Sequence, residues 1–156
     1  MRRLIFLLTV TLLVAVAASP LPAAAQAPTH VSGGGTAVGL DSSSQFGMNV
    51  TVAGDGSVSG DFNCVMAGKS AMMGLSDMTV RGRVTTVTIS TGTATFGGTG
   101  TLNMKSAQSS NRETMTVAFS VTVTPGGAGV GTLGLAVPAA SFSMSEIVTS
   151  GQISIH

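Results

Sequence analysis

From residue 46 onward, hydrophobic and polar residues alternate in short runs, which is the pattern of β-strands with one buried face. The clearest run has apolar side chains at every second position from Met115 to Val123, with threonine, serine and alanine between them. Residues 46–52 and 58–66 alternate in the same way on either side of a glycine-rich turn. This arrangement predicts a β-hairpin.

The alternation also locates an irregularity and the remaining strands. Apolar residues occupy even positions from 78 to 84 but odd positions at Val87 and Ile89, which predicts a bulge near residues 85–86. Alternation resumes over residues 94–104, whereas residues 105–113 are polar and are predicted to form an exposed loop. Shorter strands are expected toward the end of the chain, at residues 130–137, 141–145 and 152–155.

Together these segments predict an all-β fold of about eight or nine short, mainly antiparallel strands, arranged as a β-sandwich or a flattened barrel. Beyond the N-terminal segment, no window of helical length has apolar residues three to four positions apart. The predicted core contains methionine and phenylalanine, because the chain has no tryptophan or tyrosine. Methionine fills irregular gaps between strands, at some cost in how firmly the packing is specified.

The N-terminal segment has the layout of a secretory signal peptide. Arg2 and Arg3 precede an almost wholly apolar run that ends before Pro20, and small residues surround cleavage sites after Ala25 and Ala27. A membrane anchor is the alternative, but it needs about 20 consecutive apolar residues. We therefore predict a signal peptide over residues 1–27 and a single secreted β-sandwich domain over residues 28–156, with no membrane association after cleavage.

Charge and cysteine content exclude some classes of partner. Once Arg2 and Arg3 leave with the signal peptide, five basic and six acidic side chains remain, so no basic surface for nucleic acid is expected. Cys64 is the only cysteine and cannot form an internal disulfide. It is in phase with apolar neighbours, which favours a buried thiol; an intermolecular disulfide or a reactive thiol is the alternative.

The motifs of enzymes and metalloproteins are incomplete. Residues 129–134 match the GxGxxG pattern, but a strand rather than a helix is predicted to follow, which argues against a dinucleotide site. His30 and His156 could approach each other if the first and last strands were neighbours. Zinc would then still need a carboxylate such as Asp41 or Glu146. We assign no catalytic, cofactor-binding or metal-binding residues and expect no enzymatic activity.

Glycine and apolar residues form a framework that extends over most of the predicted domain. Its segments are residues 29–35, 46–50 with 56–62, 80–85 with 94–100, and 150–156. This framework resembles the post-COAP type of small bacterial secreted domains. The resemblance implies a β-sandwich-like domain, exported alone or joined to larger extracellular proteins, and implies no established activity. The chain departs from the family at residues 124–129, where an acidic Asp-Gly loop is often found, so a metal or polar site there is not expected.

These observations favour a secreted, non-catalytic domain that binds an extracellular protein or glycan at the cell surface or in the matrix. Threonine and serine faces of the sheet, together with the loop at 105–113, are the expected contact surfaces. A secreted enzyme that depends on His30 or His156 is one alternative. The other is a protease inhibitor that inserts Met72 and Met73, from a loop at residues 67–76, into its target.

Overall fold

Eight antiparallel strands close into a barrel in which each strand pairs with its neighbour in the chain and β8 pairs with β1. The structure is a computed structural model that describes residues 27–67, 74–108 and 111–156, so the predicted signal peptide lies almost entirely outside the described residues. A short 3-10 helix, η2 (Pro138–Ala140), connects β7 to β8. The strands are β1 (Thr29–Val38), β2 (Ser43–Val52), β3 (Val58–Ala67), β4 (Leu75–Ser90), β5 (Thr93–Ser106), β6 (Arg112–Thr124), β7 (Thr132–Val137) and β8 (Phe142–Ile155).

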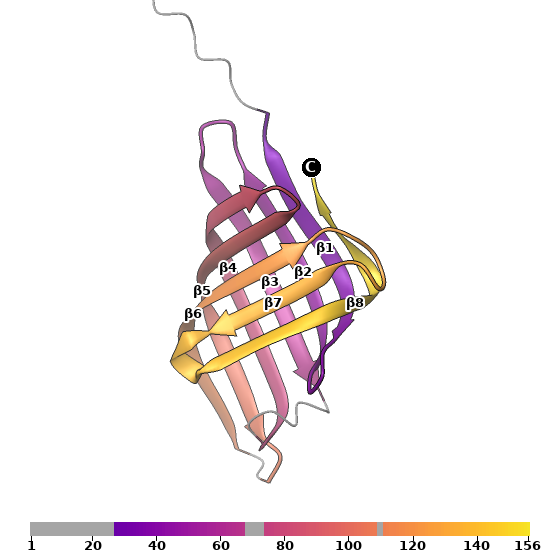
Figure 1. Ribbon diagram of the computed structural model, residues 1–156. Coiled ribbons are helices and arrows are strands. Elements are labelled where there is room, and N and C mark those ends of the chain that lie inside the picture. The colour runs from indigo at the N-terminus through magenta and orange to yellow at the C-terminus, as the bar shows by residue number, and fades with distance from the viewer. Residues whose placement is uncertain (1–26, 68–73, 109–110) are drawn as a thin grey trace, which may run out of the picture.

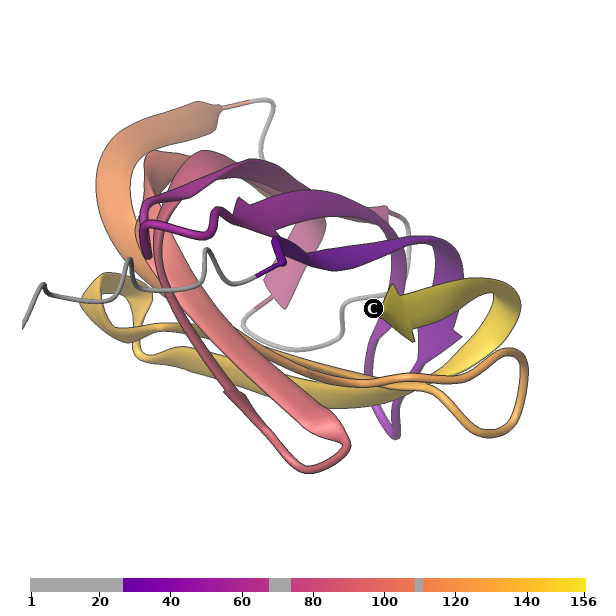
Figure 2. The same ribbon diagram turned by 90° about the horizontal axis from the view of Figure 1, so that it is seen from above.

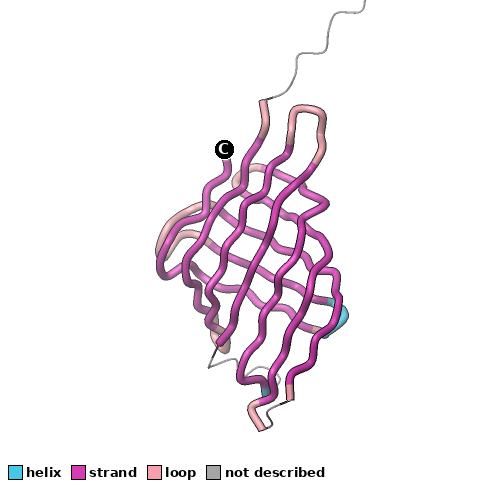
Figure 3. Tube along the Cα trace, turned by 180° about the vertical axis from the view of Figure 1, so that it is seen from behind, coloured by secondary structure: helices cyan, strands magenta, loops and turns pink. Residues whose placement is uncertain are grey.

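The barrel is flattened, with two groups of strands facing each other. Strands β1 to β3 and much of β4 and β5 run steeply side by side, whereas β6 to β8 and the hairpin end of β4 and β5 cross them at a large angle (Figure 1). The steep group is seen from behind in Figure 3, and the view from above in Figure 2 shows the elongated cross-section. The predicted all-β, antiparallel fold is therefore confirmed. Of the two arrangements expected from the sequence, closure by β1 and β8 corresponds to the barrel.

Apolar side chains of alternate residues fill the barrel interior. Three phenylalanine rings lie near its centre: Phe62 contacts Phe96 at a centroid separation of 5.9 Å and Phe119 at 5.6 Å. Room for these rings comes from an inward-facing glycine on β4. A Cβ atom added to Gly82 would lie 2.4 Å from Cε1 of Phe119 and 2.5 Å from the carbonyl oxygen of Thr99. The central aromatic cluster therefore requires the absence of a side chain at position 82.

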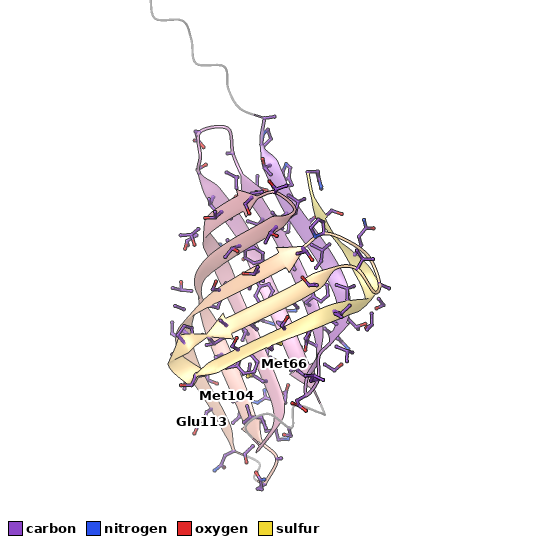
Figure 4. All side chains as sticks on the ribbon, viewed as in Figure 1. Met66, Met104 and Glu113 are labelled. Atoms are coloured by element: carbon purple, nitrogen blue, oxygen red, sulfur yellow. The ribbon has the colours of Figure 1, made fainter. Side chains whose placement is uncertain are left out.

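Methionines occupy the barrel interior toward the end at which β5 is connected to β6. Met66 and Met104 both pair with Met78, so three adjacent strands carry methionine at one level. Figure 4 shows Met66 and Met104 in this region, with Glu113 near the rim. Met66 is fully buried and Met104 is half-buried. The methionines predicted for the core thus form a flexible layer between the aromatic centre and the end of the barrel.

The bulge predicted near residues 85–86 is confirmed, because the register of β4 against β5 shifts between Val84 and Thr86. The exposed loop predicted at residues 105–113 is confirmed for its described central residues, 107, 108 and 111, but its predicted ends are wrong. Lys105 pairs with Arg112, so β5 continues to Ser106 and β6 begins at Arg112. Polar residues sit in these strand ends because the ends extend past the apolar interior.

Two further strand boundaries differ from expectation. The segments predicted at 141–145 and 152–155 belong to one strand, β8, which continues through its polar middle because β1 pairs along it. Alternation does not predict β1, whose centre is the run from Gly33 to Gly35. Because glycine has no side chain, this strand shows no alternation of hydrophobic and polar residues. Its backbone nevertheless pairs with β2 on one side and with β8 on the other.

Replacement of Gly82 by alanine should lower the free energy of unfolding by about 1–3 kcal/mol, because the new methyl group overlaps the Phe119 ring and the neighbouring backbone. Chemical denaturation measures the change. Gly47→Ala is the matched control: a Cβ atom there has no neighbour within 4 Å, so stability should change by less than about 1 kcal/mol. Equal losses for the two variants would contradict this account of the packing.

Candidate functional site

A groove flanked by polar side chains crosses the outer surface of the barrel over β2, β3 and β4, with a volume of about 730 Å³. The register of these strands arranges its outward-facing residues in two rows of three. Side chains in one row lie about 4.8 Å from strand to strand, and the two rows are about 7 Å apart. The first row is Asn49, Asp61 and Arg83, and the second row is Gly47, Asn63 and Arg81; we call these six residues the outer groove.

Hydrogen bonding and open space prepare the outer groove for a ligand. Nε of Arg81 donates a hydrogen bond of 2.9 Å to Oδ1 of Asn63, which orients the guanidinium group. Among the described residues, the side chains of Asp61 and Arg83 have no hydrogen-bond or ion-pair partner, although the two residues are directly opposite on adjacent strands. Gly47 leaves the second row open where another residue would place a side chain. Charged groups are therefore available to a ligand at the surface.

The outer groove continues along β2 in both directions. One adjoining hollow is lined by Thr51, Ser59 and Thr85, and another by Gln45, Thr36 and Ser150. From residue 45 to residue 51, the outer face of β2 spans about 20 Å. Hydroxyl groups at these ends fit the prediction that threonine and serine faces form contact surfaces. An elongated polar surface of this kind matches an extended chain better than a compact small molecule.

A second polar site lies inside the barrel, at the end where β1 turns into β2. Glu146 of β8 points inward and is only 1% exposed, and Ser44 of β2 is 2% exposed. The two side chains meet across β1, and Oγ of Ser44 donates a hydrogen bond to Oε2 of Glu146. Oε1 of Glu146 is buried without a hydrogen-bond partner among the described residues. A buried carboxyl group thus depends on one serine.

Cys64 completes this buried polar cluster of Ser44, Cys64 and Glu146. Its side chain is fully buried, as predicted from its phase in the strand. Burial raises the pKa of the Cys64 thiol to about 12; the adjacent Ser44 hydroxyl opposes the increase, and the nearby Glu146 adds to it. The thiol is therefore protonated at neutral pH and is a poor nucleophile. With all three side chains shielded from solvent, this cluster does not meet a substrate in the present conformation.

The sequence predicted that the two histidines could approach each other if the first and last strands were neighbours, and β1 and β8 are indeed paired. His30 and His156 lie directly opposite each other: His30 N donates to His156 O at 2.6 Å, and His156 N donates to His30 O at 3.0 Å. Their rings are 5.8 Å apart between centroids. Neither carboxylate considered as a further ligand is nearby, since Glu146 is inside the barrel and Asp41 follows the far end of β1. Within the described ranges, no three metal-ligating side chains converge.

Other features of the sequence have structural explanations or lie outside the described residues. In the turn between β2 and β3, Ser57 N donates a 2.9 Å hydrogen bond to Oδ1 of Asp55, and hydrogen bonds from Ser57 lower the pKa of Asp55. Residues 129–134 run from a turn into β7, which begins at Thr132, so a strand and not a helix follows Gly131. Met72 and Met73 are outside the described residues. Within the described ranges, no helix is long and apolar enough to cross a membrane.

The sequence contained a signal for the buried polar site that the predictions did not use. Glu146 follows Phe142 and Met144 at a spacing of two, and Ser44 precedes Phe46 at the same spacing, so polar residues occupy inward positions of two strands. The outer groove was harder to find. Its members have outward phase on three separate strands, and only the register between those strands places them in adjacent rows.

Loss of the Ser44 hydroxyl should destabilise the barrel, because both oxygens of a buried carboxyl group would then lack donors. We expect Ser44→Ala to lower the free energy of unfolding by about 1–3 kcal/mol. Adding Glu146→Leu should recover much of that loss, which a double-mutant cycle measures. Ser42→Ala is the control, since Ser42 is buried but its hydroxyl has no hydrogen-bond partner among the described residues. Zero coupling between positions 44 and 146 would contradict this prediction.

Cys64 should resist thiol reagents at pH 8 in the folded protein and react fully in denaturant. Because its pKa is raised to about 12 on folding, it stabilises the fold below the pKa of the unfolded thiol, near 9. This contribution is lost progressively as the pH rises from about 9 to 12. Denaturation of wild-type and Cys64→Val protein at pH 7 and pH 10.5 tests the effect, and only the wild type should lose this part of its stability. Rapid labelling of the folded protein would show that the thiol is accessible.

Comparison with known proteins does not assign this chain to a family. No family model matches the chain, and neither the curated proteins nor the solved structures include one with significant similarity to it. The resemblance to post-COAP type domains therefore stays a prediction from the sequence. Among the described residues, charged groups, hydroxyl groups and open space occur together at the outer groove and the hollows beside it.

Proposed function

We propose that this protein is a secreted, non-catalytic binding domain of the cell surface or extracellular matrix, whose outer groove holds a carboxylate-bearing polysaccharide. The observation that carries the proposal is the two-row array on β2, β3 and β4. Within about 10 Å by 7 Å it presents two guanidinium groups, two amides and one carboxylate beside an open position. Export is supported by the signal-peptide pattern and by the resemblance to secreted domains.

The chemistry of the array suits an acidic sugar chain. Guanidinium groups form paired hydrogen bonds with carboxylates, and Arg81 is already oriented by Asn63. Amides and the Asp61 carboxylate supply the donors and acceptors that sugar hydroxyl groups require. Two of the five basic residues beyond the predicted signal peptide are in this groove, so positive charge is concentrated on a chain that is otherwise poor in it. An acidic polymer is therefore favoured over a neutral one.

Binding should depend on the two arginines of the outer groove rather than on overall charge. We expect Arg81→Ala together with Arg83→Ala to weaken binding to polygalacturonate or alginate at least tenfold, because each arginine contributes a charge-assisted hydrogen bond. Isothermal titration calorimetry with oligosaccharides of these polymers measures the affinity. The interaction should also weaken as salt is added.

The matched control removes the same charge from another surface. Lys105→Ala with Arg112→Ala also deletes two cations, and the Arg112–Asp77 ion pair that it breaks is 3.5 Å long and exposed, so its stability cost is small. This variant should bind as the wild type does, and neutral dextran should bind to neither. Equal losses for the two double variants would indicate non-specific charge attraction. No binding of either acidic polymer to the wild type would overturn the proposal.

A further inference from the structure

The histidine pair, His30 and His156, is built like a chelating site. The two residues are opposite each other on antiparallel strands and exchange both backbone hydrogen bonds, so their side chains leave the sheet on the same face. That face is the outer one, because Val31 and Ile153, which have the opposite phase, are buried. His156 is exposed and His30 is half-buried. Both imidazoles can therefore be reached from solvent.

The spacing of the rings fits one bound metal ion. Imidazole nitrogen binds Zn²⁺ at about 2.0–2.1 Å, so two rings on one tetrahedral ion have centroids about 5–6 Å apart. The observed centroid separation is 5.8 Å, and the ring planes are tilted by 32°. The separation of the two rings is therefore already that of a pair bound to one ion. Pairing with β2 on one side and β8 on the other holds β1 in place, and β8 is held by β1 and by the bridge between Ile153 and Gly126, which limits the entropy lost on binding.

A neighbouring hydroxyl prepares one of the two imidazoles. Nδ1 of His30 is hydrogen-bonded to Oγ1 of Thr51 on β2 at 3.1 Å. When Nδ1 carries the proton and donates to Thr51, the lone pair of Nε2 is free to bind a metal, as in sites where a second group fixes the histidine tautomer. Among the described residues, the ring of His156 has no hydrogen-bond partner, so its nitrogens are also available.

We propose that His30 and His156 form a two-imidazole site for a borderline divalent transition-metal ion, of which Zn²⁺ and Cu²⁺ are the best matched. Imidazole suits these ions, whereas Mg²⁺ and Ca²⁺ prefer oxygen ligands. Two protein ligands leave the remaining coordination positions to water or to a donor from another molecule. The ion joins β1 to β8 and thereby stabilises the closed barrel. This site is independent of the outer groove as a binding surface.

The test is the Zn²⁺ affinity of the purified protein, without a histidine tag, measured by titration calorimetry and by the rise in thermal unfolding temperature. We expect His30→Gln and His156→Gln each to lower the affinity at least tenfold and to abolish the temperature rise, because one imidazole alone does not chelate. Thr51→Val should give a smaller loss, since it removes only the hydroxyl that positions His30. Mg²⁺ should give no effect, because it prefers oxygen ligands.

Three outcomes would overturn this site. One is an unchanged Zn²⁺ affinity in His156→Gln, which would leave His30 acting alone or place the ion elsewhere. Another is an equal rise in unfolding temperature in the wild type and in the variant lacking both histidines. The third is no measurable binding of either Zn²⁺ or Cu²⁺ to the wild type. Because neither histidine lines the outer groove itself, the Arg81 and Arg83 variant should bind Zn²⁺ normally, so the two proposals can fail separately.

Discussion

Hydrogen bonds between β1 and β8 join the two edges of the sheet. The buried contact of Ser44 with Glu146 and the histidine pair on the outer surface both exist because of that pairing. The two strands approach so closely at one point that only glycine fits. A Cβ atom on Gly35 would lie 1.9 Å from the carbonyl oxygen of Ser150, and one on Gly151 would lie 2.0 Å from that of Gly34. Both glycines also have positive φ, +151° and +85°. The glycine run that hides β1 from periodicity analysis is thus what allows β1 to close the barrel.

Closure has different consequences inside and outside. Inside, it brings Glu146 of the last strand to Ser44 of the second, and the surrounding interior is filled by phenylalanine, methionine and smaller apolar side chains. An eight-stranded barrel has an interior that side chains can just fill. Because apolar side chains occupy the interior, a ligand meets the outer surface of the barrel, where the sheet presents rows of polar groups at regular spacing.

The sequence predicted the parts of the fold that depend on local alternation. The hairpin of β2 and β3, the strand at 115–123 and the bulge near residues 85–86 follow from which positions are apolar, and the structure confirms them. Strand ends were predicted less well, because polar residues such as Lys105 and Arg112 still pair beyond the core. A barrel and a sandwich share the same alternation and differ in whether the edge strands pair. That difference depends on contacts between residues more than 100 positions apart, which no short pattern reports.

The candidate sites also differ in whether they depend on local alternation or on pairing between distant strands. The buried position of Cys64 follows from its phase in one strand, whereas the outer groove needs three strands in register. The sequence could place the two histidines together only on the assumption that the first and last strands pair, and the structure shows that pairing. Register also relates the two surface sites to each other. Thr51, which positions His30, is two residues from Asn49 on β2 and lines the hollow that continues the outer groove.

This arrangement has an electrostatic consequence for a ligand in the groove. A divalent ion held by His30 and His156 would lie at the junction of β1 and β8, whereas Arg81 and Arg83 are on β4. Three strand spacings of about 4.8 Å separate β1 from β4, a distance greater than the Debye length of about 8 Å at physiological salt. The charge of the ion is therefore largely screened from the arginines, and the two sites act independently. Open coordination positions on the ion would accept oxygen donors, including carboxylates. An acidic chain long enough to cross from β4 to β1 would interact with both, so the two surface sites favour the same class of ligand through different chemistry.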